Sequence, residues 1–99
     1  KTKVLLYLTE KQCLQLGYQK GITEGFVNYG LSIKGAVLTI FLREEDGAVK
    51  LSLRSKGAFD VNALGKTYFN GGGHKNAAGG RLEMSISNAI KHAKKHLEW

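Results

Sequence analysis

Five of the chain's 13 glycines lie in one ten-residue segment, Gly71–Gly80, together with one of its three histidines. Glycine has no Cβ and tolerates positive φ, so the N–H groups of Gly71–Gly73 could turn together toward a bound anion. His74 could donate a hydrogen bond to the same anion, and Lys75 adds a fixed positive charge. The segment is therefore a candidate phosphate-binding loop, although glycine runs are also typical of flexible turns that bind nothing.

A second candidate is Arg54, in the segment Ser52–Ser55. Its planar guanidinium could bind a phosphate through two parallel hydrogen bonds or stack on a nucleobase. An arginine on the polar face of a strand is also commonly just solvated. A histidine after glycines, such as His74, can simply hydrogen-bond a carbonyl group and fix the turn. The residues alone leave both interpretations open at both positions.

The order and spacing of these segments resemble a known family. SLRS at Ser52–Ser55, FDVNALGKTYF at Phe59–Phe69 and GGGHKNAAGG at Gly71–Gly80 are similar to the C-terminal accessory domain of DHH phosphoesterases, the DHH-associated domain of the first type. The resemblance is closest to the branch of nano-RNA hydrolases and phosphoadenosine-phosphate phosphatases, with cyclic-dinucleotide phosphodiesterases and RecJ-type exonucleases more distant. It covers residues 31–97 well and the first thirty loosely. Gly65 departs from the family pattern, in which alanine or another helix former is expected. Glycine there costs about 1 kcal/mol of helix stability.

The resemblance implies roles for these residues. The arginine of SLRS lines the substrate groove opposite the glycine loop, and the histidine of GGGH contacts the substrate phosphate near the catalytic metals. The resemblance also implies that two manganese ions, their Asp and His ligands and the Asp-His-His motif itself belong to a separate N-terminal domain. We therefore expect no catalytic residue in this chain. The expected substrate-binding residues are Arg54, Ser55, Gly71, Gly72, Gly73, His74, Lys75 and Asn76.

The carboxylates and histidines of the chain do not predict a metal centre. Two-metal phosphodiester hydrolysis needs several such ligands converging on ions ~3.5–4 Å apart. The two aspartates, Asp46 and Asp60, have sufficient structural roles in a hairpin turn and at a helix cap. His92 and His96 are one helical turn apart, but no third ligand is suggested, and the surrounding lysines indicate a solvated face. We expect this chain to bind no metal or other cofactor.

The 15 Lys and Arg residues outnumber the 8 Asp and Glu residues, which gives a formal net charge of +7 at pH 7. This favours an acidic partner such as a nucleotide or a short RNA or DNA oligonucleotide. Part of the charge comes from lysines near the C-terminus, which also suit a helix dipole and a solvated surface.

A length of 99 residues with 42% hydrophobic residues predicts a single small domain. The first residue is Lys1, so we expect an excised piece of a longer protein, with residues 1–99 forming its C-terminal substrate-binding domain. No apolar run approaches the ~20 residues that span a bilayer. The single cysteine, Cys13, is expected to be a small buried hydrophobe, which fits a reducing compartment. These two features predict a cytoplasmic protein with no membrane partner. An oligomer is possible.

The hydrophobic pattern predicts an α/β fold, a mixed β-sheet with helices packed on it. Along the return strand, apolar and polar residues alternate, which places Ser52 and Arg54 on one polar face. The glycine segment is expected to be a loop. The predicted strands are 4–8, 36–42, 49–56 and 81–84. The predicted helices begin at Thr9, Thr23, Asp60 and Ser85, the first ending at Gly17 and the second having a loop with one turn as its alternative.

We interpret the sequence as the substrate-binding half of a manganese-dependent phosphoesterase. It would hold the phosphate and nucleoside of a short oligonucleotide (nano-RNA) or of 3′-phosphoadenosine 5′-phosphate, while the missing N-terminal DHH domain cleaves. This chain alone would be inactive. The alternatives are a free-standing nucleic-acid-binding module with a steep salt dependence, or an accessory domain of a RecJ-type exonuclease or an alanyl-tRNA editing protein.

Overall fold

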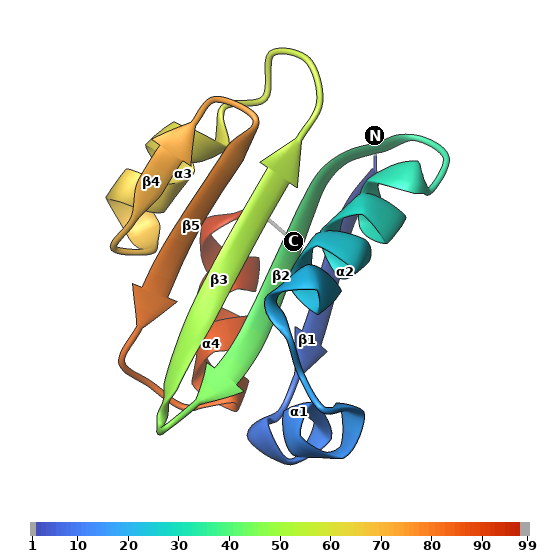
Figure 1. Ribbon diagram of the computed structural model, residues 1–99. Helices are drawn as coiled ribbons and strands as arrows, with labels where there is room; N and C mark the ends of the chain where they lie inside the picture. The colour runs from blue at the N-terminus through green and yellow to red at the C-terminus, as the bar shows by residue number, and fades with distance from the viewer. Residues whose placement is uncertain (1, 98–99) are drawn as a thin grey trace.

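A five-stranded mixed sheet carries four helices in the computed structural model, which describes residues 2–97 (Figure 1). The strand order is β1-β2-β3-β5-β4; β1 and β2 are parallel and the other neighbours are antiparallel. The α/β expectation is confirmed. The strands are β1 Thr2–Leu8, β2 Ala36–Glu45, β3 Ala48–Ser55, β4 Gly72–His74 and β5 Ala77–Leu82. The helices are α1 Glu10–Leu16, α2 Lys20–Ser32, α3 Val61–Tyr68 and α4 Ile86–His96.

The two faces of the sheet are covered differently. On one face, apolar side chains of β2 and β3 form the main core with α3 and α4. On the other face, a smaller core joins Val27 of α2 to Phe41 of β2 and to the buried Cys13 of α1. Figure 1 shows α2 lying on the β1–β2 side of the sheet, which leaves the outer strands β5 and β4 uncovered on this face. An open, partly polar sheet surface therefore lies beside α2.

Local sequence signals account for several element boundaries. The Thr9 hydroxyl accepts a hydrogen bond from the Gln12 N–H and the Gln12 side chain accepts one from the Thr9 N–H, so the capping box that starts α1 is confirmed. Gly17 ends α1 with φ of 62°, in the left-handed region. The side chains of Asp60 and Ser85 cap α3 and α4 as predicted.

Helix α2 begins earlier than the sequence predicts. Its N-cap is Gln19, which makes no side-chain capping bond, and the Thr23 hydroxyl that was expected to cap the helix hydrogen-bonds the Tyr18 hydroxyl instead. The helix persists through three glycines because packing outweighs propensity. A Cβ at Gly30 would lie 2.5 Å from the Thr39 side chain, so glycine is required where α2 crosses β2.

The glycine segment is a β-hairpin rather than the predicted loop. Strands β4 and β5 pair across a turn at Lys75 and Asn76, so the last predicted strand begins at Ala77 instead of Arg81. The glycines allow close backbone packing. A Cβ at Gly71 would overlap the carbonyl oxygen of Gly79, and one at Gly65 of α3 would lie 3.1 Å from the backbone nitrogen of Gly72. The unexpected helical Gly65 thus marks where α3 packs on the hairpin.

Within residues 2–97, none of the helices combines the length and the apolar character that crossing a membrane requires.

Candidate functional site

The register of the sheet brings Arg54 and His74 into one row. Arg54 of β3 pairs with Ala77 of β5, and Ala77 pairs with His74 of β4. Directly paired residues of antiparallel strands present their side chains on the same face, so Arg54 and His74 share the open face beside α2. The two motifs that the sequence analysis singled out, SLRS and GGGH, are therefore brought together by strand pairing.

The surface between Arg54 and His74 is almost free of side chains. The next row along the same face is Ser52, Gly79 and Gly72. Because neighbouring strands lie about 4.8 Å apart, the backbones of Arg54 and His74 are separated by roughly 10 Å, with only a methyl group and glycines between them. A planar base, a ribose or a phosphate could lie directly on this floor.

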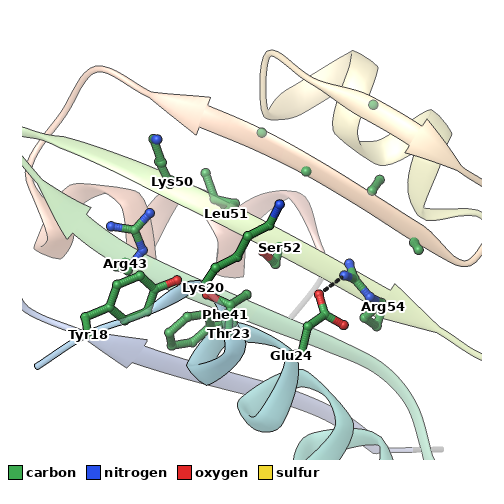
Figure 2. A pocket seen from close by; sticks show the side chains of 15 residues that line it. Tyr18, Lys20, Thr23, Glu24, Phe41, Arg43, Lys50, Leu51, Ser52 and Arg54 are labelled. Carbon is green, nitrogen blue, oxygen red and sulfur yellow. Dashed lines mark hydrogen bonds and ion pairs between the residues drawn. The ribbon is translucent and has the colours of Figure 1, made fainter. Parts of the chain in front are cut away.

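A groove of about 630 Å³ runs between α2 and the hairpin. Phe41 of β2 lines it, as Figure 2 shows. Gly79 and Gly80 of β5 line it as well. Four cations and one carboxylate line it, a formal charge of +3. These charged residues are Lys20, Glu24, Arg43, Lys50 and Arg54.

The Arg54 guanidinium already binds an anionic group. Its Nη2 donates to Glu24 Oε2 at 2.9 Å and its Nη1 donates to the Leu53 carbonyl oxygen at 3.0 Å, as the dashed line to Glu24 in Figure 2 shows in part. The Arg54 side chain is 22% exposed, whereas that of Glu24 is 55% exposed. A phosphate could replace this more exposed carboxylate while the arginine stays in place.

Ser55 and Asn76 fix the backbone around the site. Ser55 is 6% exposed, and its hydroxyl donates to the Phe59 carbonyl oxygen at 2.6 Å. The Asn76 amide donates to Ser55 Oγ at 2.9 Å and to the Gly57 carbonyl oxygen at 3.2 Å. These bonds join the hairpin turn to the β3–α3 connection and so hold His74 relative to Arg54. The expected contact of both residues with substrate stays a prediction.

Two of the three N–H groups of Gly71–Gly73, which we expect to turn toward an anion, are engaged within the protein. The Gly71 N–H donates to the Gly65 carbonyl oxygen, and the Gly73 N–H donates to Asn62 Oδ1, each at 2.9 Å. Both donors therefore serve the packing of α3 on the hairpin. Of the three successive glycines, Gly72 is the one that lines the groove. The contribution of this segment is a close-fitting backbone surface.

Lys75 and His74 lie at the exposed end of the hairpin. The Lys75 carbonyl oxygen accepts a hydrogen bond from the Val61 N–H at 2.7 Å, which ties the turn to the start of α3. Within residues 2–97, no ion pair involves the Lys75 ammonium group. Its positive charge is thus available to a ligand near His74.

The histidines of α4 pack against α3 instead of forming the solvated face that the sequence predicts. The His92 Nε2 lies 2.7 Å from the Tyr68 carbonyl oxygen, and the His96 ring stacks on the Tyr68 ring at 4.3 Å. Partial burial, with the nearby His92 and Lys95, lowers the pKa of His96 below its usual value. Both histidines lie on the sheet face opposite the groove.

Residues 2–97 hold no cluster of metal ligands, and the manganese pair that the resemblance implies would belong to a separate domain. Among residues 2–97, no three His, Cys, Asp or Glu side chains gather closely enough to hold a metal ion. The thiol of Cys13 is buried, and that burial raises its pKa, as expected for a small core residue. We assign no metal-dependent step to any of these residues.

Sequence reasoning missed the residues that α2 contributes to the groove. Lys20 and Glu24 reach it only because α2 crosses β2, and the family resemblance is loose over this segment. Lys50 could have been found, since it alternates with Ser52 and Arg54 on the polar face of β3.

The DHHA1 domain model matches residues 2–98, and the chain therefore belongs to the DHHA1 domain family. It is 32% identical over 88 residues to a 3′,5′-cyclic-nucleotide phosphodiesterase of Helicobacter pylori, covering 80% of this chain and 24% of that protein. The crystal structure of an exopolyphosphatase-related protein from Bacteroides fragilis is 45% identical, with a TM-score of 0.87 over 94% of this chain and 28% of that one. The C-Ala domain of Aquifex aeolicus alanyl-tRNA synthetase shares the fold, with a TM-score of 0.59 at 13% identity.

This chain spans only about a quarter of the length of the first two of these proteins.

Proposed function

We propose that this chain is the substrate-binding domain of a DHH-family phosphoesterase that acts on short oligonucleotides or 3′-phosphoadenosine 5′-phosphate. The observation that carries the proposal is the row formed by Arg54, Ala77 and His74, which places a guanidinium and an imidazole on either side of a flat, small-residue floor. Two hydrogen-bond donors separated by such a floor suit a phosphate with its attached nucleoside. The names of the two more similar relatives also refer to phosphate compounds.

Binding would begin with an exchange of anions at Arg54. A substrate phosphate would replace the Glu24 carboxylate on Nη2, and the His74 imidazole or the Lys75 ammonium group would reach another phosphate oxygen. The ribose or base would then lie over Ala77 and Gly79, where no side chain obstructs it. The groove holds the substrate and excludes water from one side of it.

Cleavage would belong to a separate DHH domain that supplies two manganese ions. In this proposal the open face beside α2 is turned toward that domain, because the phosphate must be reached from the side that the groove leaves open. The domain on its own should therefore bind a nucleotide and leave it intact, and we place the whole enzyme in the cytoplasm.

Substitution of Arg54 and His74 tests the proposal. A charge-assisted hydrogen bond contributes about 1.5–3 kcal/mol, so Arg54→Ala and His74→Ala should each weaken binding of a 5′-phosphorylated dinucleotide about tenfold to a hundredfold. Lys94→Ala, on the exposed surface of α4, is the matched control and should change little. Calorimetric titration gives the affinities. The melting curves of His74→Ala and Lys94→Ala should move little, since substitutions at exposed positions usually stay within about 0.5 kcal/mol, and the curve of Arg54→Ala verifies that this variant is folded.

Two results would contradict the proposal. One is an equal loss of affinity in Lys94→Ala and Arg54→Ala, which would indicate binding by diffuse charge, as in a free-standing nucleic-acid-binding module. The other is an unfolded His74→Ala protein combined with unchanged affinity in Arg54→Ala, which would make the GGGH segment purely structural.

A further inference from the structure

The groove has a second cationic end, away from Arg54. Arg43 of β2 and Lys50 of β3 line this end, and Lys20 of α2 lines the part of the groove between it and Arg54. Arg43 and Lys50 are direct partners in the β2–β3 ladder, on the same face as Arg54. Figure 2 shows Arg43 and Lys50 at one end of the groove and Arg54 at the other, with Lys20 extending over the sheet between them.

The two ends are too far apart to share one phosphate. Lys50 and Arg54 are four residues apart on β3, which at about 3.4 Å per residue separates their backbones by roughly 14 Å. A ligand that contacts both must therefore carry two separated anionic groups.

Positive charge at this end exceeds the carboxylate that balances it. Glu45 Oε1 lies 3.2 Å from Lys50 Nζ and 3.5 Å from Arg43 Nη1, so one carboxylate serves two cations. The hydrogen bond from Lys50 and the charge of Arg43 lower the pKa of Glu45, which keeps it ionised. Within residues 2–97, Lys20 pairs with no carboxylate. Lys20, Arg43 and Lys50, counted together with Glu45 beside them, carry a net charge of +2.

The Arg43 side chain is held in position. Its guanidinium carbon lies 4.3 Å from the centroid of the Tyr18 ring, and its side chain is 15% exposed. Arg43 and Tyr18 also line a neighbouring hollow, together with the carboxylates of Glu10, Glu44 and Glu45. The Arg43 guanidinium therefore lies between the groove and this acidic hollow, and its fixed position lowers the entropic cost of binding a phosphate.

We propose that Lys20, Arg43 and Lys50 form a second phosphate subsite, which binds a backbone phosphate of a linear oligonucleotide whose other phosphate is bound at Arg54. This inference rests on the proposed function and narrows its substrate class. A strand with phosphates more than one nucleotide step apart can occupy both ends, whereas 3′-phosphoadenosine 5′-phosphate or a mononucleotide occupies one. Short oligonucleotides are then the better ligands, and affinity stops rising once both ends are filled.

The test compares ligand lengths in matched charge variants of the 99-residue chain. The ligands are a 5′-phosphorylated adenosine mononucleotide and the corresponding di-, tri- and tetranucleotides of RNA, titrated by calorimetry. The variants are Lys20→Gln/Lys50→Gln, Arg54→Ala and the control Lys94→Gln/Lys95→Gln. The control also removes two positive charges, from exposed positions of α4. Melting curves verify that each variant is folded.

The subsite predicts a loss that depends on ligand length. Lys20→Gln/Lys50→Gln should weaken trinucleotide and tetranucleotide binding about tenfold or more and leave mononucleotide binding within about twofold, while Arg54→Ala weakens every ligand. The subsite is overturned if Lys20→Gln/Lys50→Gln binds ligands of every length with the same affinity as the α4 control. The proposed function still stands in that case if Arg54→Ala binds every ligand more weakly than the unsubstituted chain does. If Arg54→Ala binds every ligand normally, the proposed function fails, and this inference fails with it.

Discussion

At the scale of single residues, Glu24 is the group that competes most directly with a ligand. Its carboxylate accepts a hydrogen bond from Arg54 Nη2, and among residues 2–97 it is the one acidic side chain that lines the groove. Glu24→Gln removes the charge but keeps the size of the side chain. Because a phosphate then displaces a weaker partner and meets no like charge, affinity for a 5′-phosphorylated dinucleotide should rise about twofold to fivefold, in line with the small net energy of an exposed ion pair.

Glu83→Gln is the control for this prediction. It removes the same charge from another exposed ion pair, with Arg81, which does not line the groove. Calorimetric titration of both variants measures the difference. A weaker binding of the dinucleotide by Glu24→Gln would show that Glu24 positions Arg54 for the ligand instead of competing with it.

At the scale of elements, some glycines are required by close packing and others only lower helix stability. Gly71 lies where α3 packs on the hairpin, and a Cβ there would overlap the Gly79 carbonyl oxygen; Gly25 lies in the exposed part of α2 with open space around it. Gly71→Ala should therefore lower the free energy of unfolding by about 1–3 kcal/mol through overpacking. Gly25→Ala should raise it by up to about 1 kcal/mol through helix propensity. Urea denaturation measures both free energies. A Gly71→Ala protein with an unchanged free energy of unfolding would contradict the assigned packing.

The same contrast explains what the sequence could predict at this scale. The capping pair Thr9 and Gln12 lies within one helical turn, and the alternation that places Arg54 on a polar face lies within one strand, so local rules were sufficient. The hairpin at Gly71–Gly80 was predicted as a loop because glycine signals conformational freedom and close packing alike, and only the position of α3 distinguishes them.

Residues that arrive by tertiary packing were beyond local rules. Glu24 and Lys20 join the groove because Gly30 allows α2 to lie close to Thr39 on β2. This packing of a helix on a strand is not specified by the local sequence pattern of either element. The family resemblance directed attention to Arg54 and His74, which strand pairing places in one row on either side of Ala77; their contact with substrate stays a prediction. It supplied nothing about the cationic end of the groove.

At the scale of the whole molecule, the net charge of +7 is less informative than its distribution. The groove holds a formal charge of +3 on the open face, while Lys91, Lys94 and Lys95 lie on α4, which packs against the opposite face of the sheet. A nucleic-acid-binding module would use both surfaces and bind long strands with a steep salt dependence. A substrate-binding domain of this size would use one face.

The most direct measurement is a residue-by-residue map of the bound nucleotide. In a titration of the isotope-labelled chain with a 5′-phosphorylated dinucleotide, followed by two-dimensional NMR, the backbone amides of Ser52, Arg54, His74 and Gly79 should shift together and saturate at one equivalent. Those of Lys91–His96 on α4 should stay in place. Shifts concentrated on α4, or spread evenly over both faces without saturation, would contradict a phosphate site between Arg54 and His74.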